Sequence, residues 1–320
     1  MNNDYWFYDL PTLAHFSSEQ AKRKLSELYD VEMLKNELTA FNDSQQPSDI
    51  NWDNIGAPAP PNTFSGWNFL GDKAWQHTAH TVGYIAPTAD NNHDVKIQSP
   101  SNIVPSQNLQ GSRIKITLNA LRVASYPGSG THHILFDFYA QNQLPETTEH
   151  LHFNSTYRVR EGQRAAILNY PIFLGLNVGN GGLIFKCLTV NVKNEEDEQA
   201  IQFLESDAFK TGLQLATTVQ PAIKPLSEMA MGLTRSIANR RKNVPVQDIQ
   251  IGLDFGSNPM GARLAEGVYI AVQIPEALTR VWDWSDWIYD VSTGQIVNDY
   301  HRDQLIPYNY IAFGISRYNS

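Results

Sequence analysis

The stretch GSRIKITLNALR, residues 111–122, decides the fold class of this chain. In it Ile114, Ile116 and Leu118 alternate with polar residues, so one face of the segment is apolar and the other is polar. A period of two residues is typical of a half-buried β-strand. The alternation shifts phase at Ala120 and Leu121, which indicates a β-bulge. We therefore expect a bulged strand here, within a sheet that buries one face.

Alternation of the same kind recurs along residues 111–194 and again along residues 246–318. The apolar positions expected to face inward are Ile134, Phe136, Phe138, Ala140, Leu151, Phe153, Tyr157, Val159, Ile249, Ile251, Leu253, Phe255, Val268, Ile270, Val272, Ile274, Ile311, Phe313 and Ile315. The Asn-Gly-Gly sequence at 180–182 predicts a hairpin-like turn into a strand at 184–192. Neither group of strands can cover both of its faces alone, so the two groups should share a core. The sequence thus predicts a mainly β chain forming one antiparallel β-sandwich.

Residues 197–243 interrupt the strands with a helical pattern. Ile223, Leu226, Ala230, Leu233 and Ile237 recur every three or four positions, as on the apolar face of an amphipathic helix. The acidic residues at 195–198 suit a helix N-terminus, where unpaired N–H groups carry partial positive charge. We therefore expect a helical insertion in the sandwich.

Residues 1–110 are less regular than the rest. Ser17 or Ser18 can cap a helix that continues to Leu38, and a polar loop and a proline-rich piece at 57–62 follow. Residues 64–84 are too rich in aromatic side chains for a free linker. The expected organisation is an N-terminal helical and irregular extension over residues 1–110, packed on a sandwich that spans residues 111–320 and carries the insertion at about 197–243.

The order and number of the expected strands resemble those of C2-type sandwiches in shape. The resemblance includes no shared motif, and it implies a fold and not a function, because one fold serves many functions.

Composition excludes several classes of protein. The chain has 320 residues and a formal net charge of −9, which disfavours a nucleic-acid binder, since phosphate contacts require a positive footprint. Its one cysteine, Cys187, lies in a strand-like run and is expected to be a buried, reduced thiol. The first residues lack the pattern of a secretory signal, and no window holds the ~18 apolar residues of a membrane span. We expect a soluble, cytoplasmic protein.

Two features point to a partner-binding role. Four cations, Arg235, Arg240, Arg241 and Lys242, end the amphipathic helix of an otherwise acidic chain, a local reversal of charge that can attract an acidic partner. The second feature is WDWSDW, residues 282–287, which we call the Trp segment; it presents Trp282, Trp284 and Trp287 within six residues. We expect contact with a protein partner or a second copy. Peripheral contact with an anionic membrane is a less favoured alternative, because so few cations bind a bilayer weakly.

Two weaker patterns could hold a metal ion. His77 and His80 stand three positions apart, and on a helix they would share a face and could bind Zn²⁺. Asp283, Asp286 and Asp290 could supply oxygen ligands to Ca²⁺, although their spacing does not match a twelve-residue calcium loop. No cofactor is predicted, and Ca²⁺ or Zn²⁺ remains an alternative at these positions.

No nucleophile elbow, phosphate-binding loop or dinucleotide fingerprint occurs in the sequence, so no catalytic residue is proposed. The interpretation we favour is a non-catalytic interaction or scaffold protein that uses the sandwich and its helical insertion. One alternative is a hydrolase with scattered Asp, Glu or His residues. Another is a carbohydrate-binding module that uses the tryptophans of the Trp segment.

Overall fold

The computed structural model describes residues 73–87, 94–143, 148–167, 169–193, 197, 237–238, 243–256, 258 and 261–318. These residues form three β-sheets joined by short 3-10 helices, and all the sheets are antiparallel apart from one two-residue parallel pair. The prediction of a mainly β, antiparallel chain is confirmed. Within the described residues no helix is long and apolar enough to cross a membrane.

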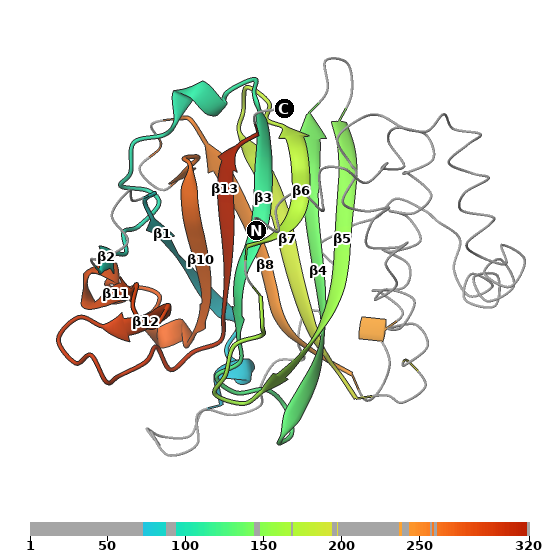
Figure 1. Ribbon diagram of the computed structural model, residues 1–320, viewed down its shortest axis with the longest axis vertical. Coiled ribbons are helices and arrows are strands. Elements are labelled where there is room, and N and C mark those ends of the chain that lie inside the picture. The colour runs from blue at the N-terminus through green and yellow to red at the C-terminus, as the bar shows by residue number, and fades with distance from the viewer. Residues whose placement is uncertain are drawn as a thin grey trace, which may run out of the picture.

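Two of the sheets have five strands each (Figure 1). Sheet 1 has the order β1 (Ala79–Ile85), β10 (Gly267–Ile274), β13 (Tyr310–Arg317), β3 (Arg113–Arg122) and β6 (Tyr170–Asn177). Sheet 2 has the order β5 (Thr148–Arg160), β4 (Thr131–Gln143), β7 (Leu183–Val192), β8 (Val244–Asp254) and β9 (Ala262–Arg263). The 3-10 helices are η3 (Ala74–Gln76), η4 (Gln107–Leu109), η6 (Glu276–Leu278) and η7 (Trp284–Asp286).

The third sheet is small and lies at one side of the molecule in Figure 1, beside β1 and β10. It consists of β12 (Gln295–Asn298), β11 (Trp287–Asp290) and β2 (Val95–Lys96), in that order, and we call it the side sheet.

The alternating residues behave as the sequence predicts. In β3, Ile114, Ile116 and Leu118 are fully buried, and the pairing of β3 with β13 shifts register between Leu118 and Ala120. This irregularity is the predicted bulge, displaced by one residue to Asn119. In β4, Phe136 and Phe138 are likewise fully buried.

One hydrophobic cluster, which we call the main core, includes side chains from both five-stranded sheets. At its centre, Phe185 of β7 meets Phe313 of β13 edge to face, with ring centroids 4.6 Å apart. Phe138 of β4 stacks on Phe185 at 5.2 Å and also reaches Phe173 of β6 at 6.0 Å. Edge-to-face and offset contacts of this kind stabilise a core beyond the area they bury. The two strand groups therefore share a core, as predicted.

Sheet 1 is also buried on its outer face. Ile270, Val272 and Ile274 of β10 point away from the main core and join a second cluster with Trp284 and Ile296 of the side-sheet region. Tyr269 and Ala271, which alternate with these residues along the strand, belong to the main core. Strand β10 thus has two buried faces, which explains why its sequence, GVYIAVQI, is apolar at nearly every position.

A buried polar network links the two five-stranded sheets. Asn309 donates from Nδ2 to Gln273 Oε1 (3.0 Å) and to the Ser125 carbonyl (2.9 Å). Gln273 in turn donates to the carbonyl oxygens of His77 (2.6 Å) and Val246 (2.7 Å), the latter in sheet 2. Gln273 and Asn309 are fully buried. Because buried amides are costly unless they are satisfied, this network favours one mutual placement of the sheets.

One local prediction is wrong, and another holds only in part. Residues 79–85 were assigned to an irregular extension, yet they form β1 and pair with β10 along their whole length, because alternate residues of β1 cover the second cluster. Residues 180–182 do form the predicted tight turn, closed by an antiparallel bridge between Gly179 and Gly182, but the flanking strands β6 and β7 belong to different sheets and do not pair. The turn instead carries the chain from sheet 1 to sheet 2.

The remaining helical predictions lie almost entirely outside the described residues. This applies to the helix expected between Ser17 and Leu38 and to most of the insertion at 197–243; of the latter, the structure describes Asp197, in a 3-10 conformation, and the helical pair Ile237 and Ala238. The C2-like shape also stays a prediction.

The two ends of the insertion meet at one side chain. Asn243 accepts a hydrogen bond from the Lys193 backbone N–H (2.8 Å) and donates to Asp197 Oδ2 (2.6 Å) and to the Ile237 carbonyl (2.7 Å). Asn243 is 7% exposed and Asp197 is fully buried. The point where the chain leaves sheet 2 is therefore fixed to the point where it returns.

Replacing Phe138 with alanine should lower the free energy of unfolding by about 3–5 kcal/mol, because it removes a ring that spans both sheets and leaves a cavity. Urea unfolding followed by circular dichroism measures this change. Ile184→Ala is the matched control on the neighbouring strand β7, since Ile184 is 42% exposed and its truncation should cost far less. Equal losses in the two variants would contradict the shared core.

Candidate interaction surface

The Trp segment folds into a single 3-10 turn followed by a strand. The carboxylate of Asp283 accepts a hydrogen bond from the Ser285 N–H (2.8 Å) and caps η7. This bond is the main reason that the pKa of Asp283 lies below its ordinary value. The chain then enters β11 at Trp287, so the turn places the three tryptophans at different depths.

The tryptophans form an aromatic cluster and not an open platform. Trp284 is 6% exposed and belongs to the second core cluster, while Trp282 and Trp287 are partly buried against it. The indoles of Trp282 and Trp287 are parallel, with centroids 5.8 Å apart, and Trp284 meets Trp282 edge to face at 5.4 Å. Tyr308 completes the cluster at 5.9 Å from Trp282. The segment therefore anchors the side sheet on sheet 1.

Trp284 of this segment packs directly on Gly83 of β1. A Cβ atom at this position would lie 2.6 Å from Cγ2 of Ile97 and 2.9 Å from two ring carbons of Trp284. Only a residue without a side chain lets the indole approach the strand this closely. The glycine thus has a packing role, because its backbone is not in the left-handed region.

An exposed loop follows β12, and we call residues 298–305 the rim loop. Asn298 Oδ1 accepts from the backbone N–H groups of Tyr300 and His301, both at 3.0 Å. Backbone bonds from Asn298 to Gln304 and from Asp299 to Asp286 close the loop on two sides. Tyr300, at its tip, is 76% exposed. A short loop with this many internal bonds presents its tip in a defined conformation.

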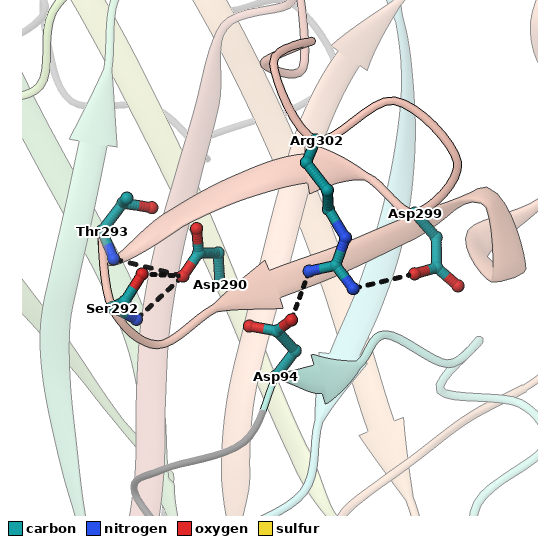
Figure 2. A network of polar contacts seen from close by, with 6 residues as sticks. All are labelled: Asp94, Asp290, Ser292, Thr293, Asp299 and Arg302. Atoms are coloured by element: carbon teal, nitrogen blue, oxygen red, sulfur yellow. Dashed lines mark hydrogen bonds and ion pairs between the residues drawn. The ribbon is translucent and has the colours of Figure 1, made fainter.

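An ion pair ties the rim loop to Asp94, the residue before β2, as Figure 2 shows. The Arg302 guanidinium lies between two carboxylates, pairing with Asp94 and with Asp299 at 3.4 Å. Arg302 is half exposed, so the pairs contribute little to stability, and their main effect is to orient the loop.

The predicted metal ligands do not converge. Asp290 points into its own turn and accepts from the Ser292 hydroxyl (2.6 Å), which keeps the pKa of Asp290 low. Asp283 caps η7, and Asp286 is the last residue of the same 3-10 helix. Among the described residues, no group of three or more His, Cys, Asp or Glu side chains is placed to hold a metal ion.

The helix that would have placed both histidines on one face is not formed. His77 follows η3 in extended backbone and packs against Tyr308, with ring centroids 5.9 Å apart, whereas His80 lies inside β1. Residues three apart in an extended segment point to opposite faces. The helical premise of the zinc hypothesis is therefore wrong.

Of the predicted contact residues, the structure describes only the three tryptophans. Arg235, Arg240, Arg241 and Lys242 lie outside the described residues. Tyr300 and the rim loop are not among the contact residues predicted from the sequence. The available signal was Asn298 followed by Asp299, a pair that favours a turn after a short apolar strand.

Comparisons of the chain with protein-family models, with curated proteins and with solved structures found no match.

Gly83→Ala should lower the free energy of unfolding by about 1–3 kcal/mol, because the new methyl group must displace Trp284 or Ile97. Urea unfolding followed by tryptophan fluorescence reports both stability and the indole environment. Gly252→Ala in β8 is the control, since a Cβ there would meet nothing within 4 Å. If both variants behave alike, the close seat of Trp284 on β1 is refuted.

His80 should make stability depend on pH. Burial lowers its pKa from 6.5 to about 4, and its Nε2 is buried without a hydrogen-bond partner in the described chain. Because the unfolded state takes up this proton first, the stabilising contribution is complete above pH 6.5 and declines as the pH falls toward 4. The loss at about pH 5 should be up to about 2 kcal/mol.

Urea unfolding at about pH 7.5 and about pH 5 measures this loss, and His80→Asn should reduce it. His301→Asn, on the exposed rim loop, is the control and should leave the pH dependence unchanged. If the free energy of unfolding of the His80→Asn variant falls with pH as much as that of the wild type, other groups cause the pH dependence.

Proposed function

We propose that the protein is a non-catalytic interaction protein that binds a protein partner, or a second copy of itself, through the side sheet and its rim loop. The observation behind this proposal is the exposure of Tyr300 at the tip of a loop that is fixed by hydrogen bonds and ion pairs. The two five-stranded sheets act in it as a sandwich scaffold that holds this surface.

Exposed apolar side chains gather in this region. Five large hydrophobic side chains are exposed among the described residues, and three of them, Val281, Tyr300 and Leu305, flank the Trp segment or belong to the rim loop. Tyrosine is enriched at protein interfaces because it offers a large apolar area together with a hydrogen-bonding group.

Preorganisation strengthens the proposal. Ordering a flexible loop on binding costs free energy, and a loop already held in one conformation avoids much of that cost. The rim loop has internal bonds at both ends and an ion pair to Asp94, so Tyr300 would reach a partner without a large ordering step.

The alternatives have less support. A sugar ring stacks on an open indole face, but Trp284 is buried and Trp282 and Trp287 are partly buried against each other. A hydrolase would need convergent carboxylates or histidines, and the carboxylates of Asp283 and Asp290 serve separate turns. The cations at 235–242 remain a second predicted contact with a protein partner, ahead of an anionic membrane.

A Tyr300→Ser, Leu305→Ser double variant should fold normally, because both side chains are exposed, and should reduce association at least about tenfold. Sedimentation velocity over a range of concentrations measures self-association. Affinity capture from a native extract, with quantitative mass spectrometry, measures binding of other proteins.

Val104→Ser is the matched control, since Val104 is 85% exposed and lies outside this region. It should retain whatever the wild-type protein binds. Unchanged association in the double variant argues against the rim loop. Absence of any association, together with turnover of a generic ester or glycoside, would favour the hydrolase.

A further inference from the structure

Two arginines lie side by side on the outer face of sheet 1. Arg122 ends β3, where it pairs with Tyr310 of β13 on one side. On its other side it forms an isolated antiparallel bridge with Arg164. Residues directly opposite in antiparallel strands present their side chains on the same face. Arg164, Arg122 and Tyr310 therefore form a row of neighbours, which we call the arginine row.

Neither arginine has a carboxylate partner within the described chain. Arg122 donates from Nη1 to the Gly162 carbonyl (3.1 Å). Arg164 donates to the carbonyls of Gly294 and Thr293, in the turn between β11 and β12. Ion pairs do form elsewhere in the described residues, for example between Lys186 and Asp248 at 3.1 Å. Asp290, which opens the turn held by Arg164, directs its carboxylate to Ser292 and Thr293 instead.

Arg122 is buried with unused donors. Its side chain belongs to a residue that is only 9% exposed, and its Nε is buried without a hydrogen-bond partner. Nη2 also donates to no described group, but it is not buried, so it keeps access to solvent. Nη2 is therefore the donor of Arg122 that an oxyanion can reach, and a hydrogen bond between a guanidinium and an oxyanion is stronger than one between neutral groups. A buried cation without a counter-charge is costly, and a bound anion would remove that cost.

The charges around Arg122 agree with a site that binds an anion. Burial is the main cause that lowers the pKa of Arg122; Tyr310 opposes it, and the charge of Arg164 lowers the pKa further. Burial raises the pKa of Tyr310, and the charges of both arginines and a hydrogen bond from Arg164 oppose that rise. The two positive charges lie in a chain whose net charge is −9, so their proximity is a local feature and not the result of a basic composition.

From this arrangement we propose that the arginine row binds a small divalent oxyanion of the phosphate type, held by Nη2 of Arg122 and by Arg164. Two guanidinium groups match the charge of a dianion. The burial of Arg122 selects a small ligand, either free phosphate or the phosphate group of a small molecule, over a nucleic acid or a membrane. The inference does not depend on the proposed partner-binding function.

Isothermal titration calorimetry with inorganic phosphate, in a chloride buffer of constant ionic strength, tests the proposal. The wild-type protein should show saturable binding to one site, and acetate should bind at least about tenfold more weakly, because it has one negative charge and a planar shape. A parallel titration with glycerol 3-phosphate separates the two sources of ligand. Tighter binding of the ester supports a small phosphorylated molecule, and tighter binding of the inorganic ion supports free phosphate.

Arg122→Gln should weaken phosphate binding at least about tenfold, since it removes both the charge and the Nη2 donor. Arg164→Gln provides a second variant, because Arg164 is exposed and its loss should leave the fold intact. Arg317→Gln, an exposed arginine at the opposite end of β13, is the control and should bind phosphate as the wild type does. The proposal is overturned if the wild type shows no saturable binding, or if a folded Arg122 or Arg164 variant binds with wild-type affinity.

Discussion

The double burial of sheet 1 is the constraint on which the rest of the structure depends. Its strands β10 and β13 send alternate side chains into the main core and into the second cluster under the side sheet. A strand with two apolar faces cannot leave either face to water without losing the free energy of burial. The side sheet is therefore an integral layer of the fold, and the surface it presents is held in place by the same residues that hold the strands together.

Strands with one buried face could be predicted from the sequence, and those with two could be predicted only in part. In β3 and β4 the polar and apolar residues alternate, and the inward set was identified correctly, including the bulge beside Ala120. In β10 the set Val268 to Ile274 was recognised as a strand face, but it faces the second cluster, while Tyr269 and Ala271 face the main core. A continuous apolar run reveals burial without revealing which layer lies on which side.

In the candidate surface, the Trp segment that anchors it could be predicted from the sequence, and the exposed tip of the rim loop could not. The three tryptophans drew attention because they are large and close together in the sequence, yet their size is what buries them. Tyr300 and Arg302 carry no periodic signal, and their positions result from hydrogen bonds to Asn298 and an ion pair with Asp94, 208 positions away. The arginine row escaped notice for the same reason, since Arg122 and Arg164 become neighbours only through strand pairing.

The junction at Asn243 has a topological consequence. Its side chain joins Lys193 to the start of β8 across 50 positions of sequence, so β7 and β8 remain adjacent whatever the intervening chain contributes. The entropy of closing that long connection is offset locally, by the bond between Asn243 and Lys193 and by the bonds from Asn243 to Asp197 and Ile237. The junction is thus a fixed point of attachment for the segment between β7 and β8. The intervening segment could diverge, shorten or be exchanged for another module, while the register of sheet 2 stays the same.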